Sequence, residues 1–277
     1  MKFSVVTINF NNRDGLYFTL RSVANQTFKD KECIVIDGGS TDGSLDVIQS
    51  FSETVDYYVS ERDSGVYNAM NKAIRHSRGE WVIFMNSGDR FHSSSVLEDV
   101  AKDCSADIIV GSTNRCVRKS LTDITDVEEL LAPKEITASH IFKYGFNHQS
   151  SFIKTELLRR NPYDETLKIV SDWKFFVEEL VFNNCSYQSI PTIIADYDIS
   201  GMSSNPNLVH CEKQKVLRSI LSPRIYNDYQ VIMYGETDLD KILIEMGHDC
   251  KAYRLITIIA KLIRKSQLIV GRISRSI

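Results

Sequence analysis

Hydrophobic and polar residues follow two different periods along the first hundred residues. Short apolar runs predict buried β-strands, and the segments between them repeat their apolar residues every three or four positions, which predicts amphipathic helices. The strands are expected at residues 3–8, 32–37, 55–60 and 81–85. Strands and helices that alternate at this spacing are typical of an α/β fold with a doubly wound, mostly parallel central sheet. Ligands of such sheets bind at the carboxyl ends of the strands.

The pattern becomes less regular in the second half of the chain. Residues 112–145 indicate a strand or hairpin followed by a crossing rich in loops. The periodic segments around this crossing predict strands at 107–111 and 190–197 and helices at 156–160, 173–182 and 208–221.

A basic amphipathic helix is expected at about residues 251–270. Leucine and isoleucine form its apolar stripe, and residues 251–277 hold seven cationic side chains and no acidic one, although the whole chain has a net charge of −3. Such a helix either packs on the body with a solvated basic face or lies on an anionic membrane surface, and the second reading is favoured. The tail lacks interleaved aromatic residues apart from Tyr253, so no nucleic acid partner is expected.

Neither a membrane span nor an export signal is expected. No apolar run reaches the roughly 18 residues that a spanning helix needs, and the first residues turn polar too early for a signal peptide. The six cysteines form no C-x-x-C pair, so we expect reduced structural thiols. These features predict a cytoplasmic protein.

Polar residues gather where the first two predicted strands end. The first strand runs into Thr7-Ile8-Asn9-Phe10-Asn11-Asn12, with no glycine-rich phosphate-binding signature. Its amides and aromatic ring fit a base or ribose, or alternatively cap the first helix. Asp37 ends the second strand before Gly-Gly-Ser-Thr-Asp-Gly. Its carboxylate can accept from a base N–H or a ribose hydroxyl, and a helix cap is the alternative.

The fourth predicted strand ends at Asn86-Ser87-Gly88-Asp89. Asp89 is expected to project at the top of the sheet. A hard divalent cation there takes one or two carboxylates plus phosphate oxygens, and it neutralises a diphosphate leaving group. The alternative is a simple turn that contains an aspartate.

Four motifs in this order resemble those of the family 2 glycosyltransferases, which have the GT-A fold. The motifs span residues 4–12, 36–42, 60–71 and 79–89. The resemblance is strong over residues 3–100, thinner over 140–205, and does not extend over 206–277. Asn86 and Gly88 stand where other members often have acids, and Gly38 replaces a frequent second aspartate. These variants resemble a subgroup linked to bacterial surface polysaccharides.

The resemblance implies roles for individual residues. Asp89 is implied to bind Mn²⁺ or Mg²⁺, with weak affinity until the diphosphate of the donor is bound. The residues implied to surround the nucleotide are Thr7, Asn9, Asp37, Asp63 and Asn71.

The resemblance places the catalytic base at a helix start in the second half. Ser171-Asp172-Trp173 fits this pattern, so Asp172 is the expected base, with helix capping as the alternative. Contacts with the acceptor, or with a loop that closes over the donor, are implied for a further set of residues, of which His148 has a structural alternative. This set is Asn86, His148, Trp173 and Ser203.

The sequence therefore predicts an inverting, metal-dependent glycosyltransferase that moves a sugar from a nucleotide-sugar, with UDP favoured, to a saccharide or polyprenyl-diphosphate-linked glycan on the inner face of the cell membrane. A GT-A catalytic domain is expected at 1–205, with a nucleotide-sugar half (1–111) and an acceptor half (112–205), followed by a helical extension (206–277). The alternatives are a non-catalytic nucleotide-sugar-binding protein and a nucleotidyltransferase. The sequence leaves sugar, linkage and oligomeric state open.

Overall fold

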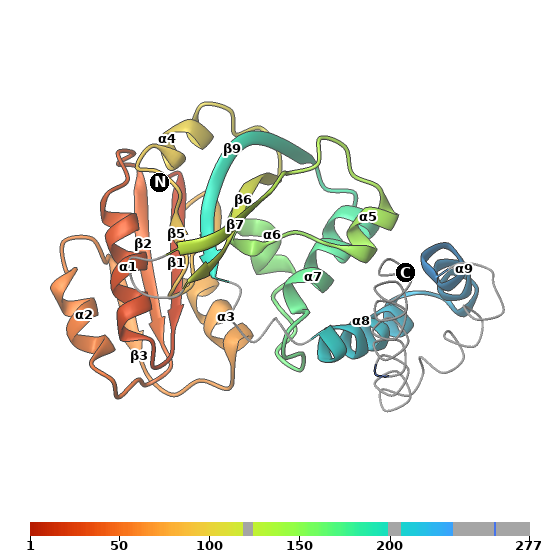
Figure 1. Ribbon diagram of the computed structural model, residues 1–277, viewed down its shortest axis with the longest axis horizontal. Helices are drawn as coiled ribbons and strands as arrows, with labels where there is room; N and C mark the ends of the chain where they lie inside the picture. Colours follow the sequence, from red (N-terminus) through yellow and green to blue (C-terminus); the bar gives the residue numbers. More distant parts are fainter. Residues whose placement is uncertain (119–123, 199–205, 235–257, 259–277) are drawn as a thin grey trace, which may run out of the picture. The chain divides into compact units, whose positions relative to one another are not determined.

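The computed structural model describes residues 1–118, 124–198, 206–234 and 258 (Figure 1). The chain divides into two compact units, Met1–Ser204 and Asn205–Ile277. The predicted contact of Ser203 and the predicted basic helix at 251–270, apart from Ile258, lie outside the described residues. The functions assigned to the predicted domains stay predictions.

The first half of unit 1 is a parallel α/β arrangement. Its sheet order is β3-β2-β1-β4, with all neighbours parallel. Strands and helices alternate without exception along this part of the chain, as the two periods predict. They are β1 (Phe3–Asn9), α1 (Arg13–Ala24), β2 (Lys31–Asp37), α2 (Ser44–Ser50), β3 (Tyr57–Ser60), α3 (Val66–His76) and β4 (Trp81–Phe84).

Both faces of this parallel sheet are buried. Phe3 and Val5 of β1 share one core cluster with Leu16 and Leu20 of α1. The alternate positions of β1 face the other way, where the apolar stripe of α3 packs against β1 and β2. A parallel sheet that is covered on both faces needs apolar strands, and all seven residues of β1 are buried.

The second half of unit 1 turns the sheet into a mixed one. Strand β8 is antiparallel to β4 on one side and to β6 on the other, and β9 is parallel to β6. Figure 1 shows β9 as a long, curved strand beside β6. The elements are β5 (Arg90–Phe91), α4 (Val96–Ala101), β6 (Ile108–Arg118), β7 (Ile124–Leu130), α5 (Ala138–Lys143), η1 (His148–Ser150), β8 (Ser151–Lys154), α6 (Thr155–Arg160), α7 (Ser171–Phe176), η2 (Val177–Phe182) and β9 (Tyr187–Asp198).

The predicted fold class is confirmed, and two details differ from expectation. The hairpin expected after residue 111 is the antiparallel pair of β6 and β7. Strand β8 was not predicted, because its run of four residues is too short for periodicity to separate it from the helix that follows.

Unit 2 contains α8 (Pro206–Ile220) and α9 (Pro223–Tyr234). A buried polar network joins the two helices: Gln214 Oε1 accepts from Tyr226 Oη at 2.5 Å and from Gln230 Nε2 at 3.1 Å. Cys211 of α8 is disulfide-bonded, so the expectation of reduced thiols is wrong at this position. Among the described residues, no helix has both the length and the apolar character that crossing a bilayer requires.

Candidate active site

The carboxyl ends of β1, β2 and β4 meet at one edge of the sheet. Asn9 at the end of β1 is the register partner of Asp37 at the end of β2. The turn Asn86–Asp89 follows β4, the neighbour of β1 on its other side. Parallel pairing therefore places three of the predicted motifs side by side, although up to 80 residues separate them in sequence.

Asp37 organises the loop after β2. Its carboxylate accepts from Asn9 Nδ2 at 2.7 Å, from the hydroxyls of Ser40 and Ser60 at 2.6 Å each, and from the backbone N–H groups of Gly39 and Ser40. The side chain is completely buried. Burial alone raises the pKa of Asp37, but the hydrogen bonds from Ser40, Ser60 and Asn9 outweigh it, so the pKa lies below its usual value. Asp37 is thus a fixed anion that shapes the loop.

Asp63 lies beside the position where relatives carry an extra acid. A Cβ atom added to Gly38 would lie 2.8 Å from Asp63 Oδ2 and 3.0 Å from the ring of Phe10. Phe10 is 66% exposed, and Asp63 is half-buried. An exposed ring next to a carboxylate offers a stacking face and an acceptor, the two groups that a nucleobase or ribose needs.

Two further residues predicted near the nucleotide, Thr7 and Asn71, are buried. Thr7 is completely buried within β1. Both polar atoms of the Asn71 side chain bond to the segment before α7, since Nδ2 donates to Tyr163 O at 2.8 Å and to Glu165 at 2.9 Å, and Oδ1 accepts from Tyr163 N at 3.0 Å. The structure does not bring either residue together with Asp63 through a hydrogen bond, and their nucleotide contacts stay predictions.

The turn after β4 is held by α1. Thr19 Oγ1 donates to the backbone oxygen of Asp89 at 2.6 Å, and it accepts from Gly88 N at 3.0 Å. Asn12 caps α1 through Gly15 N and also donates to Ser87 O at 3.0 Å. Gly88 has a φ of +108°, a conformation that L-residues rarely adopt. The Asp89 side chain is 93% buried, and Gln149 Nε2 donates to its Oδ2 at 3.2 Å.

A chain of hydrogen bonds joins the turn after β4 to the predicted base. Asn86 Nδ2 lies 2.9 Å from His148 Nε2, and His148 Nδ1 lies 2.9 Å from Asp172 Oδ2. An amide nitrogen only donates, so Nε2 is the acceptor and Nδ1 carries the proton that is donated to Asp172. The imidazole is thereby fixed in one tautomer. His148 and Asp172 side chains are each 17% exposed, so solvent or substrate can reach them.

The other carboxylate oxygen of Asp172 is occupied by the protein. Tyr67 Oη lies 3.0 Å from Oδ1 and 2.5 Å from Ile169 O, so its one proton is shared between two acceptors, and Trp173 N donates to Oδ1 at 2.9 Å. Burial and the adjacent Asp172 carboxylate raise the pKa of Tyr67 far above its usual value, so its hydroxyl stays a donor. Trp173 itself is buried, and its Nε1 donates to Ile141 O at 2.9 Å. Trp173 therefore stabilises the site through its hydrogen bond to α5.

The structure thus brings together Asn86, His148 and Asp172, and it sets Gln149 on Asp89. Sequence reasoning missed Gln149 and Tyr67 as members of this arrangement. Gln149 stands next to His148 in the motif, and that adjacency was an available signal. Tyr67 looked like one more apolar position on the buried face of α3, so its pattern gave no signal.

Comparison with known proteins matches residues 4–167 to the family described as "Glycosyl transferase family 2". This match covers more than half of the chain. The chain belongs to glycosyl transferase family 2. Its predicted membership is confirmed, and the glycosyltransferase activity class follows from it. The match ends before Asp172, so the base assignment does not rest on it.

Curated relatives of this glycosyltransferase are bacterial. An uncharacterized glycosyltransferase of Mycobacterium tuberculosis (strain H37Rv) is 29% identical over 206 residues, which are 73% of this chain and 77% of the relative. Poly(ribitol-phosphate) beta-N-acetylglucosaminyltransferase TarP of Staphylococcus aureus (strain N315) is 27% identical over 252 residues, which are 83% of this chain and 75% of TarP.

Solved structures show the same fold. S. aureus TarS 1-349 in complex with UDP-GlcNAc superposes with a TM-score of 0.62 at 18% identity, over 83% of this glycosyltransferase and 70% of that chain. The match to a longer chain of TarS covers 42% of it. A mannosyltransferase from Pyrobaculum calidifontis, in complex with GDP-Man and Mn²⁺, gives a TM-score of 0.54 at 16% identity, over 91% of this chain and 69% of that one.

Proposed function

We propose that this glycosyltransferase transfers a sugar from a UDP-sugar to a saccharide hydroxyl with inversion at the anomeric carbon. The hydrogen-bonded series Asn86–His148–Asp172, which starts in the same turn as Asp89, carries this proposal. It joins a general base to the turn expected at the diphosphate. A non-catalytic protein would not need a base at this position.

Two groups at the sheet edge support a nucleotide site. Phe10 offers an exposed ring, and Asp63 stands in the space that the missing side chain of Gly38 leaves. The TarS neighbours were solved with UDP and with UDP-GlcNAc, and the archaeal neighbour was solved with GDP-Man. UDP is therefore our first choice of donor nucleotide, and GDP is its main competitor.

The residues around Asp89 fit a divalent cation. Asp89 supplies a carboxylate, and Asn86 Oδ1 is buried without a hydrogen-bond partner while its Nδ2 is held by His148. No cluster of three His, Cys, Asp or Glu side chains suited to a metal occurs within the described ranges. A site with one carboxylate and one amide oxygen suits Mg²⁺ or Mn²⁺ that is shared with a diphosphate. When bound, the cation would stabilise the negative charge of the leaving diphosphate.

Asp172 acts as the general base in this proposal. Among the residues that the structure describes, Tyr67 and Trp173 contact Oδ1, whereas Oδ2 accepts from His148 alone and keeps one acceptor position for a substrate. The acceptor hydroxyl donates to Oδ2 and transfers its proton there as its oxygen attacks the anomeric carbon. The bond to the nucleotide diphosphate breaks on the opposite face, so the configuration inverts and no covalent sugar–enzyme intermediate forms.

The acceptor is proposed to be a glycan of a bacterial surface polysaccharide, free or linked to polyprenyl diphosphate. The names of the relatives support this class: TarP is named for poly(ribitol-phosphate), and others for PGL/p-HBAD biosynthesis. The basic segment at 251–277 supports a place on the inner face of the cell membrane, next to such a lipid-linked acceptor.

A thermal-shift panel tests the donor site. The full chain is heated with UDP, GDP, CDP or dTDP, each with and without Mn²⁺, alongside Asp89→Ala. Binding to the native state raises apparent stability by RT ln(1 + [L]/Kd). We expect a metal-dependent shift with UDP that Asp89→Ala loses. A shift with GDP alone would replace UDP in the proposal. Absence of any shift from folded protein would overturn the proposed donor site.

Transfer is then measured with radiolabelled UDP-sugars, UDP-GlcNAc first, and bacterial membranes as the acceptor source. We expect labelled glycan with one of the sugars. Release of sugar 1-phosphate and UTP when pyrophosphate is added, instead of transfer, would point to the nucleotidyltransferase alternative, which family membership already disfavours.

A further inference from the structure

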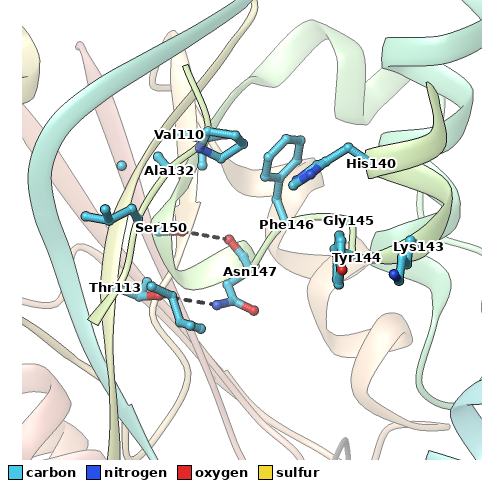
Figure 2. A pocket seen from close by; sticks show the side chains of 14 residues that line it. Val110, Thr113, Ala132, His140, Lys143, Tyr144, Gly145, Phe146, Asn147 and Ser150 are labelled. Carbon is cyan, nitrogen blue, oxygen red and sulfur yellow. Dashed lines mark hydrogen bonds between the residues drawn. The ribbon is translucent and has the colours of Figure 1, made fainter. Parts of the chain in front are cut away.

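A pocket of about 390 Å³ lies beside η1 and is not used by the proposed donor site. Figure 2 shows its walls, which come from β6, from the segment after β7, and from the segment between α5 and η1. Its volume falls within the range of preformed small-molecule sites. The pocket lies in unit 1, in the half of the chain that follows the nucleotide motifs.

The pocket is connected to His148 and Asp172 by consecutive residues of the chain. Asn147 lines the pocket and donates to Thr113 Oγ1 at 3.3 Å, as Figure 2 shows. The next residue, His148, contacts Asp172. Strand β6 runs in the same direction as β4, because both are antiparallel to β8. The pocket wall and the turn that carries Asp89 therefore reach the same edge of the sheet.

Helix α7 fixes the pocket wall relative to the base. Trp173 follows Asp172 and donates to Ile141 O in α5. A Cβ on Gly145 would lie 2.7 Å from Trp173 Cδ1, so the wall segment and the indole are in close contact. A ligand in the pocket is consequently held at a set distance from Asp172.

The lining suits a sugar ring with a negative charge. Tyr144 is 63% exposed, so its ring is available for the C–H face of a pyranose, and Phe146 in the wall is held by stacking on Tyr187 at 5.4 Å. Asn147 and His140 add polar atoms at the wall. Lys143 lies 5.0 Å from the centroid of the Tyr144 ring. None of the described lining residues is acidic, although acidic side chains commonly bind the hydroxyls of neutral sugars.

We propose that this pocket binds a sugar unit of the acceptor glycan that carries a carboxylate or a phosphate. The proposal rests on the proposed glycosyltransferase reaction and names its acceptor class. Tyr144 provides the ring contact, and Lys143 provides the charge that selects an anionic unit over a neutral one.

Binding of simple glycosides to the full chain tests the pocket. Saturation-transfer NMR is recorded with methyl β-D-glucuronide, with glucose 6-phosphate and with neutral methyl β-D-glucoside. We expect at least one anionic probe to bind at least fivefold more tightly than the neutral one, and the better of the two identifies the charged group. Equal binding of all three probes, or no binding of either anionic probe, would overturn the proposal.

Variants locate that binding. Lys143→Ala and Tyr144→Ala should each weaken the anionic probe at least fivefold, while the UDP-dependent thermal shift of both proteins stays at the wild-type value. Lys134→Ala is the matched control, because Lys134 is an exposed lysine near this segment but outside the pocket lining. Probe binding that survives Lys143→Ala would refute the assignment.

The two proposals fail separately in these experiments. A normal UDP shift without glycoside binding rejects the pocket and leaves the donor site standing. Glycoside binding that depends on Lys143, without any nucleotide shift, supports the pocket and rejects the transfer reaction.

Discussion

The two oxygens of Asp172 have different surroundings, and this difference defines their roles. Oδ1 is filled by Tyr67 and the Trp173 backbone, and Oδ2 faces His148. Within the described part of the chain, three groups position the carboxylate, and Oδ2 is the oxygen that keeps room for a substrate. A base held in this way loses little conformational entropy when the acceptor arrives.

Replacing Asp172 with Asn should abolish transfer while the fold and nucleotide binding persist. The amide still accepts from Tyr67 and Trp173 through its oxygen, but it cannot take a proton. We expect kcat to fall by roughly 10²–10⁴-fold, the usual loss of a general base. The measurement is radiolabelled transfer beside the UDP thermal shift. Asp107→Asn is the control, since Asp107 precedes β6 at the opposite edge of the sheet. Retained transfer in Asp172→Asn would assign the base to another residue.

Two glycines explain where this chain departs from the usual acids of its family. Gly88 has a φ of +108°, so an aspartate there would strain the turn that carries Asp89. Gly38 leaves space that the Asp63 carboxylate fills. An aspartate at position 88 would therefore be strained, and Asp63 supplies a carboxylate beside position 38.

At the scale of elements, α7 is the support of the site. It carries Asp172, and the Trp173 indole of α7 donates a hydrogen bond to α5. Lys174 of the same helix donates to Asp164 Oδ2 at 2.9 Å. The helix has only six residues before the π-type segment η2, so tertiary contacts rather than helix length stabilise it. Loss of one contact should therefore disturb both function and stability.

Gly145→Ala should displace the loop that α7 supports. The φ of +69° disfavours alanine, and the added Cβ would meet the Trp173 ring at 2.7 Å. We expect a loss of about 1–3 kcal/mol in the free energy of unfolding, which urea titration measures. Gly145→Asn separates the two causes, because asparagine tolerates this φ but carries the same Cβ. An asparagine variant as stable as wild type would show that a Cβ atom at position 145 does not clash with the Trp173 ring.

The ion pair of Asp164 makes stability depend on pH. A hydrogen bond from Thr166 lowers the pKa of Asp164 from its usual 3.8 to about 2, with burial opposing and Lys174 assisting. A depressed pKa in the folded state means that the stabilisation is present above about pH 4 and is lost as the pH falls towards 2. The side chain is 27% exposed, so we expect only about 1 kcal/mol.

Urea unfolding at pH 6 and pH 3 tests this contribution. Wild type should exceed Asp164→Asn by about 1 kcal/mol at pH 6, and the difference should shrink at pH 3. Asp46→Asn, at an exposed acid on α2, serves as the reference. A difference that does not change with pH would contradict the ion-pair account.

At the scale of the whole molecule, charge is unevenly distributed between residues 1–250, the acidic body, and residues 251–277, the basic end. All seven charged side chains of residues 251–277 are cationic, whereas the rest of the chain is net acidic. Repulsion of the body from an anionic surface and attraction of the tail would together orient the protein on a membrane.

Vesicle sedimentation tests whether the basic end binds anionic membranes. The full chain should bind vesicles that contain phosphatidylglycerol and should not bind pure phosphatidylcholine. High salt should release it, because exposed charges are screened. The triple variant Lys261→Gln, Arg264→Gln and Lys265→Gln should bind several-fold more weakly, while its UDP shift is unchanged. Equal binding to both vesicle types would contradict attraction by charge, and absence of binding to either type would favour a basic face that is exposed to solvent.

The sequence by itself determined the parallel α/β half and the strand-end position of Asp37 and Asp89. Those features follow from local periodicity and from the rule that parallel strands share one carboxyl edge. It also indicated Asp172, through a motif at a helix start, and the family. It did not indicate β8, because a run of four residues has no measurable period.

Only the tertiary structure decided which side chains meet. Insertion of β8 between β4 and β6 sets η1 beside the turn after β4, and this places His148 between Asn86 and Asp172. The same packing sets Asn71 on Tyr163 and directs Asp63 towards Gly38. Hydrogen bonds between residues 24 to 105 positions apart depend on strand order and helix packing. The local pattern of residues contains no information on either.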